Sequence, residues 1–261
     1  MITGEEDCTE DILGYQVSSC IKDSCVRKAE ECIAAGASKK YAVCVNPHSL
    51  VQAKADSLFR QAIKEADLIL PDGAGIVLAS RILNGEIRER VTGSDLFFGL
   101  SESLNATGGA SYFFLGSTHS NLLAIKEKLG VDFPNIRVAG MYSPPFKEKF
   151  SPEDNRLMID AISEANPDVL WVGMTAPKQE KWIAENRGRL NVKFIAAVGA
   201  VFDFYTGKVK RPHPFFQRMG LEWLPRLIRE PSRLWKRTFV SVPILLWDVA
   251  VQWVKRRSSR N

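Results

Sequence analysis

Short apolar runs alternate with segments of helical periodicity along most of the chain. The apolar runs have the length of buried strands and cover residues 41–45, 67–70, 111–115, 135–139, 168–172 and 192–198. Between them, apolar positions recurring every three or four residues predict helices at 49–65, 75–83, 93–105, 121–129, from 151 onward, and at 178–190. Strands separated by helices predict a Rossmann-like α/β fold, a mostly parallel sheet with helices on both faces.

The pattern changes after Gly207, where tryptophans and basic residues become frequent. Over residues 240–255, four polar residues fall on one stripe of a helix, and valine, leucine and tryptophan fill most of the remainder; the four are Ser241, Asp248, Gln252 and Lys255. This pattern is typical of a helix in a membrane interface. Packing on the core, a dimer interface and a nucleic-acid patch are the alternatives. We therefore predict an α/β domain over 1–207 and a basic amphipathic helical appendage over 208–261.

Charge separates the same two parts. The chain has 261 residues and a net charge of +5. Residues 211–261 contain 11 Lys or Arg and three acids, a net +8, so the first 210 residues carry −3. Such asymmetry indicates a polyanionic partner: a membrane, a nucleic acid or a phosphorylated substrate. Because the basic residues accompany an apolar helix, an anionic membrane surface is favoured, with no nucleic acid. The apolar tail also fits a homo-oligomer.

The termini and cysteines indicate a cytoplasmic protein. The first ten residues are acidic without an apolar run, and Asp248 and Gln252 interrupt the most apolar C-terminal window. All five cysteines lie within the first 44 residues, in odd number and without zinc-ligand spacing. Free thiols in a reducing compartment are the better interpretation.

Several familiar nucleotide and metal motifs are absent from the sequence. It contains neither G-x-G-x-x-G after the first strand nor G-x-x-x-x-G-K-[ST]. It also lacks D-x-D, the usual device for holding a metal-bound sugar diphosphate, and its three histidines are scattered. We therefore expect a site of carboxylates, loop amides and arginines, with no metal and no cofactor.

Three polar residues are candidates to face a ligand, and two of them directly follow predicted strands. Asp72 lies in a Pro-Asp-Gly turn at a strand's carboxyl end, where it either acts as a base or serves as a turn former. Asn46 follows the first of these strands and either orients a ligand hydroxyl or forms the turn before Pro47. Arg90 either pairs with a phosphate or is a surface arginine.

The segment 173–180 combines a glycine turn with the expected start of a helix. Gly173 ends a strand and Pro177 suits a first helical position. Free amides at such a helix terminus bind anions, and Lys178 and Gln179 are placed to reach a diphosphate or a sugar. An ordinary strand-to-helix loop is the alternative.

Taken in order, the motifs resemble those of the WecG/TagA/CpsF glycosyltransferases of bacterial surface-polymer synthesis, from about residue 13 to residue 237. The motifs are Val43-Cys44-Val45-Asn46, Pro71-Asp72-Gly73, Arg90-Val91-Thr92-Gly93, Gly173 with Pro177-Lys178-Gln179-Glu180, Gly199 with Phe202-Asp203 and Gly207, Leu221-Glu222-Trp223-Leu224-Pro225-Arg226 and Glu230-Pro231-Ser232-Arg233.

The resemblance implies an inverting, metal-independent transfer from a UDP-sugar donor to an undecaprenyl-diphosphate-linked sugar acceptor. The enzyme would be peripheral on the inner face of the cell membrane. The sugar would be a hexose or N-acetylhexosamine, with an N-acetylmannosamine type favoured and glucose or another hexose as the alternative. A competing class is an NAD-dependent nucleotide-sugar oxidoreductase or epimerase, which the missing G-x-G-x-x-G disfavours.

The resemblance also implies roles for individual residues. Asp72 is the catalytic base, and Cys44 stands where the family has a threonine, which leaves the role of that position open. The implied substrate-binding residues are Cys44, Asn46, Arg90, Gly93, Gly173, Lys178, Gln179, Asp203, Arg226, Arg229 and Arg233.

Overall fold

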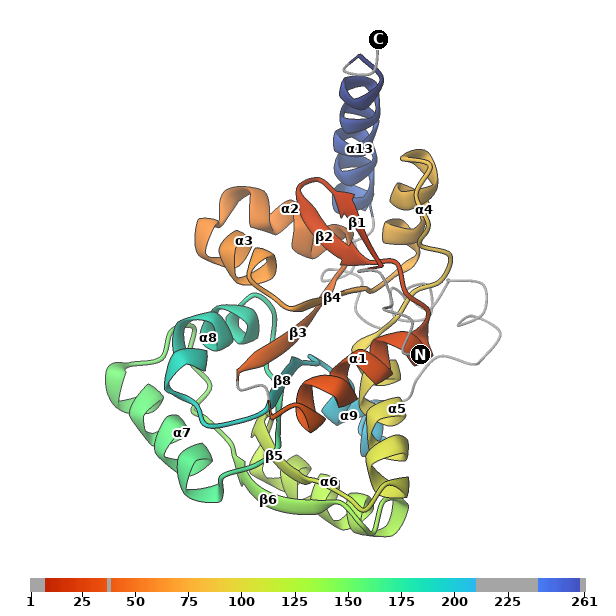
Figure 1. The fold of residues 1–261 in the computed structure, drawn as a ribbon. Helices are drawn as coiled ribbons and strands as arrows, with labels where there is room; N and C mark the ends of the chain where they lie inside the picture. The colour runs from red at the N-terminus through yellow and green to blue at the C-terminus, as the bar shows by residue number, and fades with distance from the viewer. Residues whose placement is uncertain (1–7, 37–38, 210–238, 259–261) are drawn as a thin grey trace.

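A computed structural model of the chain describes residues 8–36, 39–209 and 239–258 and contains a six-stranded parallel sheet (Figure 1). The strand order is β4-β3-β8-β7-β5-β6, and every neighbouring pair is parallel. The strands are β3 (Lys40–Val45), β4 (Leu68–Pro71), β5 (Ser111–Gly116), β6 (Arg137–Tyr142), β7 (Val169–Gly173) and β8 (Phe194–Ala197). The predicted parallel α/β sheet is confirmed.

Helices cover both faces of this sheet, as predicted. They are α1 (Lys22–Ala34), α2 (Pro47–Ala55), α3 (Ser57–Lys64), α4 (Ala74–Ile82), α5 (Gly93–Ala106), α6 (His119–Asp132), α7 (Pro152–Ala165), α8 (Lys178–Asn186) with the 3₁₀ turn η1 (Arg187–Arg189), and α9 (Val201–Tyr205). Alternate residues of a strand face opposite sides. In β7, Leu170 and Val172 accordingly join the core under α2, α3, α7 and α8, whereas Val169 and Trp171 join the core under α1, α5 and α6.

Some element boundaries differ from the sequence prediction. The helix expected at 49–65 is two helices, because Asp56 adopts an extended conformation and its side chain caps α3 by accepting from the backbone N–H of Phe59. Asp56 also forms an ion pair with Lys181 of α8, which fixes the break. The strand expected at 135–139 begins at Arg137, since Asn135 is hydrogen-bonded to Asn105 in the last turn of α5. The strand expected at 192–198 is shorter in the structure, where β8 covers only Phe194–Ala197.

Two N-terminal elements were not predicted: helix α1 and an antiparallel hairpin of β1 (Thr9–Ile12) and β2 (Tyr15–Ser18). Leu13 and Gly14 both have positive φ, the conformation of a tight hairpin turn. Ile12, Tyr15 and Val17 are buried beside the larger sheet. The alternation is too short to separate from loop sequence by pattern alone.

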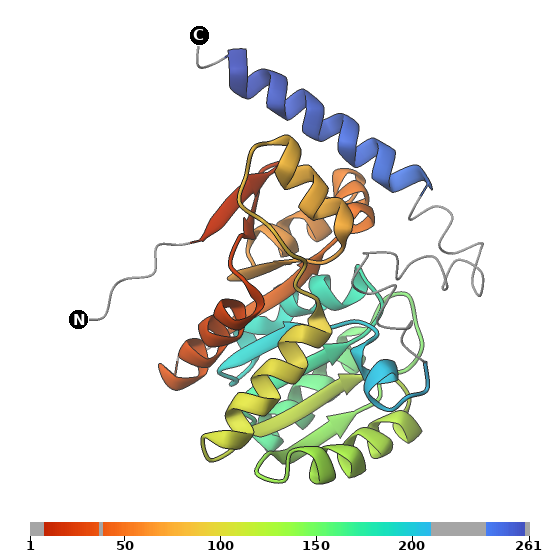
Figure 2. The same ribbon diagram turned by 90° about the vertical axis from the view of Figure 1, so that its right-hand side faces the viewer.

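The C-terminal helix α13 (Ser241–Ser258) is present and lies along the body of the protein (Figure 2). Ser241 is hydrogen-bonded to His48, and Asp248 forms an ion pair with Lys54. Gln252 accepts from the backbone N–H of Leu13. Leu245 and Val249 are buried in the core on the same side, so α13 packs on the body through a mixed face of polar and apolar residues. Much of the apolar remainder is exposed, and so is Lys255 of the predicted stripe. None of the helices in the described ranges is long and apolar enough to cross a membrane.

Candidate functional site

A cavity of about 770 Å³ lies at the carboxyl ends of the parallel strands. Its lining comes from the residues that directly follow β3, β4, β5, β7 and β8, together with the first turns of α5 and α8. Ligands of open α/β sheets bind at this edge because the loops converge there. Each predicted site residue within the described ranges lines this cavity: Cys44, Asn46, Asp72, Arg90, Gly93, Gly173, Lys178, Gln179 and Asp203.

Asp72 is held at the cavity by the backbone on both sides of it. Its N–H donates to the carbonyl oxygen of Val45 at 2.8 Å, so the carboxylate follows β4 directly beside the end of β3. Gly73 has a φ of 106°, which lets α4 begin at once. Asp72 is half-buried and lines the cavity. A strand-end carboxylate in this position can accept a proton from a bound hydroxyl group.

Asn46 acts as the N-cap of α2. Its side-chain oxygen accepts from the backbone N–H groups of His48 and Ser49, each at 3.0 Å, and the Ser49 hydroxyl accepts from the Asn46 N–H in return. This is the local role given as the alternative in the sequence prediction. The side chain nevertheless lines the cavity, so ligand contact by Asn46 stays a prediction.

Cys44 lies among three carboxylates. Burial raises the pKa of its thiol well above the usual range, and the charges of Asp72, Glu180 and Asp95 raise it further. The thiol is therefore protonated at neutral pH. Asp72, Asp95 and Glu180 all line the strand-end cavity. The sequence prediction missed this grouping because the three residues come from different elements, namely the turn after β4, helix α5 and helix α8.

Gln179 and Glu180 begin helix α8 and are both buried. The Gln179 side-chain oxygen accepts from the backbone N–H of Met174 at 3.2 Å and of Gly199 at 3.1 Å, which joins the ends of β7 and β8. Its side-chain NH₂ donates to Oε1 of Glu180 at 2.8 Å. Oε2 of Glu180 has no partner among the described residues, and burial raises the pKa of this carboxyl to about 7.

Lys178 is tied to the loop between β6 and α7. Its ammonium group donates to the carbonyl oxygen of Lys147 at 2.9 Å and lies 5.0 Å from the ring centre of Phe150. These contacts orient Lys178 at the cavity mouth. Pro177, the residue before it, provides no side-chain cap. The Lys178 N–H instead donates to the carbonyl oxygen of Thr175 at 2.9 Å, and the first turn of α8 forms this wall of the cavity.

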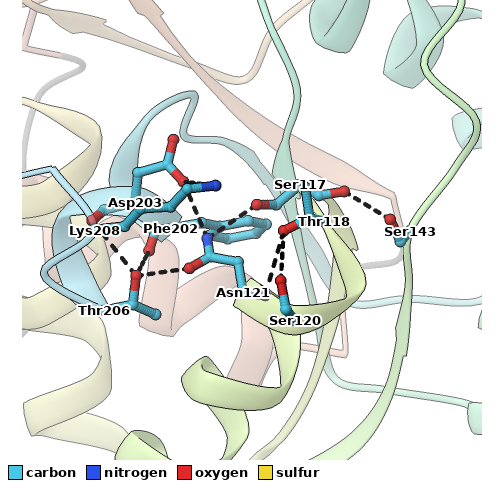
Figure 3. Close-up of polar contacts among 9 residues, drawn as sticks. All are labelled: Ser117, Thr118, Ser120, Asn121, Ser143, Phe202, Asp203, Thr206 and Lys208. Atoms are coloured by element: carbon cyan, nitrogen blue, oxygen red, sulfur yellow. Dashed lines mark hydrogen bonds and ion pairs between the residues drawn. The ribbon is translucent and has the colours of Figure 1, made fainter.

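Asp203 belongs to a hydrogen-bonded group at another wall of the cavity (Figure 3). Asn121 donates from its side-chain nitrogen to Asp203 at 3.1 Å and to the hydroxyl of Ser117 at 2.9 Å. Thr206 in turn donates to the side-chain oxygen of Asn121 at 2.7 Å, and Nζ of Lys208 lies 4.0 Å from Asp203. Thr118 caps α6 by accepting from the backbone N–H of Asn121, but nothing in the local sequence indicated the pairing of Asn121 with Asp203.

The two predicted glycines leave room for closely packed neighbours, and their contact with a ligand stays a prediction. A Cβ atom on Gly93 would lie 3.2 Å from the backbone of Val198 and 3.4 Å from Sγ of Cys44. A Cβ atom on Gly173 would lie 2.3 Å from the ring of Phe202, which is buried directly against it. Gly93 thus lets the start of α5 approach Val198, and Gly173 lets α9 pack against the end of β7.

Replacing Gly173 with alanine is expected to destabilise the protein by about 1–3 kcal/mol, because the added methyl group overlaps a ring with no space to move. The displaced Phe202 adjoins Asp203, so substrate affinity should fall as well. Urea unfolding measures the loss. Gly188→Ala is the control, since no atom lies within 4 Å of its added Cβ. Equal stability of the two variants would contradict the packing role.

Arg90 also lines the cavity, on the segment that the Val91 N–H fixes to the Pro71 carbonyl oxygen at 2.9 Å. The predicted arginines Arg226, Arg229 and Arg233 lie outside the described residues. Within the described ranges, no group of three or more His, Cys, Asp or Glu residues is arranged to hold a metal ion.

A parallel α/β sheet with this polar, carboxylate-bearing cavity at its strand ends belongs to the class of α/β enzymes with a strand-end active site. Comparison with known proteins narrows the class. A model of the glycosyl transferase WecG/TagA/CpsF family matches residues 10–259, so the chain belongs to this family and is a glycosyltransferase. This confirms the resemblance found in the motifs and leaves the oxidoreductase alternative without support.

Relatives resemble the chain over most of its length. It is 33% identical over 199 residues to the N-acetylglucosaminyldiphosphoundecaprenol N-acetyl-beta-D-mannosaminyltransferase of Bacillus subtilis, covering 76% of this chain and 74% of that protein. Identity to the protein of the same name from Bacillus spizizenii is 32% over 203 residues, covering 78% and 76%. A Staphylococcus aureus protein with this name is 27% identical over 214 residues, covering 80% and 79%.

Proposed function

We propose that this glycosyltransferase transfers N-acetylmannosamine from a UDP-sugar donor to an undecaprenyl-diphosphate-linked N-acetylglucosamine. The names of the Bacillus and Staphylococcus relatives support the two sugars and the lipid-linked acceptor. The observation that carries the proposal is Asp72, a carboxylate fixed by its backbone at the strand-end cavity.

In the proposed reaction, Asp72 takes the proton of the acceptor hydroxyl group. The oxygen attacks the anomeric carbon of the donor from the side opposite UDP, and the carbon–oxygen bond to UDP breaks with its electrons leaving on the diphosphate. The configuration at the anomeric carbon is inverted. A base is needed because a protonated alcohol is a weak nucleophile.

The charge that develops on UDP needs stabilisation. The first turn of α8, with Lys178, and Arg90 both line the cavity, and the arginines of the 208–261 segment add to them in this proposal. The transfer then proceeds without a divalent metal. Activity that is unchanged in excess chelator is the expected result, and strict dependence on an added divalent cation would contradict it.

Asp203 is proposed to bind the nucleotide end of the donor. Its carboxylate is oriented by Asn121 and is half-buried at the cavity, which suits an acceptor for ribose hydroxyl groups. We expect Asp203→Ala to raise the KM for the UDP-sugar about tenfold or more, since a hydrogen bond to a charged group contributes about 1.5–3 kcal/mol, with a smaller effect on kcat. Ser120→Ala, an exposed change on the neighbouring helix, is the control. Initial-rate kinetics with varied donor would refute the assignment by giving an unchanged KM.

The decisive test of the sugar assignment uses a panel of UDP-sugars with polyprenyl-diphosphate-linked acceptors. Product mass identifies the transferred sugar. Transfer of N-acetylmannosamine to the N-acetylglucosamine acceptor is the expected outcome. Efficient transfer of glucose or another hexose instead would show that the N-acetylmannosamine donor is wrongly assigned. Failure to transfer any sugar would contradict the proposed reaction.

The acceptor lipid places this reaction at a membrane surface, so we propose a peripheral location on the inner face of the cell membrane. The 208–261 segment would act as the appendage that holds the enzyme there. The exposed apolar residues of α13 support this: Trp247 is 72% exposed and Val254 54% exposed. Exposed apolar surface of this kind marks an interaction site.

A further inference from the structure

A second cavity, which we call the α13 groove, lies between α13 and the body of the protein. Its volume is about 1010 Å³, and it shares no lining residue with the strand-end cavity. The turn of the β1–β2 hairpin forms one wall, α2 and α3 form another, and α13 closes the groove. It is therefore separate from the proposed reaction site.

Positive charge predominates in this groove. Its lining contains five basic and two acidic side chains, namely Lys54, Arg60, Lys64, Lys255, Arg256, Asp11 and Asp248. Both carboxylates are already in ion pairs: Asp248 with Lys54 at 2.7 Å, and Asp11 with Arg256 at 3.0 Å. The lining has a net charge of +3, and its other basic residues are Arg60, Lys64 and Lys255.

Neutral groups orient two of these three cations. The guanidinium group of Arg60 donates to the carbonyl oxygens of Ala53 and Lys54, and Nζ of Lys64 lies 5.9 Å from the ring centre of Tyr15. Neither contact cancels the positive charge. A phosphate group entering the groove would thus meet cations that the fold has already positioned.

The remaining lining is apolar and reaches the exposed side of α13. Leu13, Leu50 and Val251 contribute to the walls. Val251 follows Trp247 by one helical turn and precedes Val254 by three residues, and all three are exposed. The groove therefore adjoins an apolar stripe, a combination that suits an amphiphile with an anionic head.

We propose that the α13 groove binds the headgroup of an anionic glycerophospholipid. Its phosphate would lie among Arg60, Lys64 and Lys255, and its acyl chains would follow the apolar stripe of α13. A free anion would use the charges but not the stripe. This inference rests on the membrane association in the proposed function and adds to it a defined lipid site outside the reaction cavity.

Short-chain lipids that stay monomeric in solution test the site directly. Calorimetric titration of the full chain with dihexanoyl phosphatidylglycerol should show saturable binding of one lipid. Dihexanoyl phosphatidylcholine and glycerol 1-phosphate should each bind at least tenfold more weakly, since the first has no net charge and the second has no acyl chains. Equal affinity for glycerol 1-phosphate would make this a free-phosphate site and overturn the lipid assignment.

Removing basic charges distinguishes a specific lipid site in the groove from a general attraction of the anionic lipid to the basic protein surface. Lys64→Gln/Lys255→Gln should weaken phosphatidylglycerol binding about thirtyfold, the factor for about 1 kcal/mol per basic residue. The control pair Lys126→Gln/Lys149→Gln removes the same charge from exposed positions elsewhere and should change affinity less than twofold. Unchanged binding in the groove pair, or an equal loss in both pairs, overturns the proposal.

A vesicle experiment distinguishes the proposed lipid site in the α13 groove from the more general proposal that α13 associates with the membrane. Trp247→Ser should reduce sedimentation with vesicles of mixed phosphatidylcholine and phosphatidylglycerol, because it removes the most exposed apolar side chain of the stripe. If that variant binds vesicles as the wild type does, membrane association through α13 fails. If it is impaired but the groove pair still binds the short-chain lipid normally, only the groove assignment fails.

Discussion

Replacing Asp72 with asparagine is expected to lower kcat by about 10²- to 10⁴-fold, the usual contribution of a positioned general base. Asparagine has nearly the same shape and also suits a turn, so the bond from the residue 72 N–H to the Val45 carbonyl oxygen should survive. The amide cannot take up the acceptor's proton. Single-turnover transfer from a radiolabelled UDP-sugar measures the loss, and circular dichroism confirms the fold.

A matched carboxylate outside the cavity provides the control. Asp56→Asn changes the residue that caps α3, where asparagine caps as well as aspartate does. This variant should transfer sugar at close to the wild-type rate. Near-normal turnover by Asp72→Asn would remove Asp72 from the role of base, even if the cavity is the active site.

The second large effect is expected at Glu180. Replacing its ionisable carboxyl group with a neutral amide should stabilise the protein above neutral pH. Burial raises the pKa of this carboxyl from 4.5 to about 7. One pKa unit corresponds to about 1.4 kcal/mol, so the folded state disfavours the ionised form by about 3 kcal/mol. Between these two pKa values the folded protein binds more protons than the unfolded chain, so this group's contribution to stability falls as pH rises from about 4.5 to 7.

Glu180→Gln removes the ionisation and keeps an oxygen to accept from Gln179. The variant should match the wild type near pH 4.5 and exceed it by up to about 3 kcal/mol above pH 7. Urea unfolding at a series of pH values measures this difference. Glu185→Gln, an exposed change on the same helix, should show no such trend. A difference between Glu180→Gln and the wild type that does not vary with pH would contradict burial of an ionisable carboxyl.

The cavity could be assembled from the sequence to a considerable extent. Because the carboxyl ends of parallel strands share one edge, Asp72, Asn46 and Gly173 were expected together, and they are. The sequence did not reveal that Gln179 joins two strand ends or that Glu180 lines the same cavity as Asp72. Those relations depend on the order of strands in the sheet, which local pattern does not determine.

The C-terminal helix shows the same limit. Hydrophobic periodicity located the helix and its polar stripe, but it did not show which face of the helix packs against the body of the protein. His48, Lys54 and Asp11 offer hydrogen-bonding and charged partners to the stripe, so the polar residues face inward. Buried polar groups are retained when such partners satisfy them. The apolar stripe is left exposed as a result, and the α13 groove forms beside it.

The sequence by itself determined the alternation of strands and helices, the strand ends that carry polar residues, the basic C-terminal segment and the family resemblance. These are properties of neighbouring residues, because periodicity, turn chemistry and charge act over a few positions. Only the tertiary structure decided the partners of Gln179, the raised pKa of Glu180 and the direction in which α13 faces. Each depends on burial and contact between distant parts of the chain, as between Leu13 and Gln252, which only folding brings together.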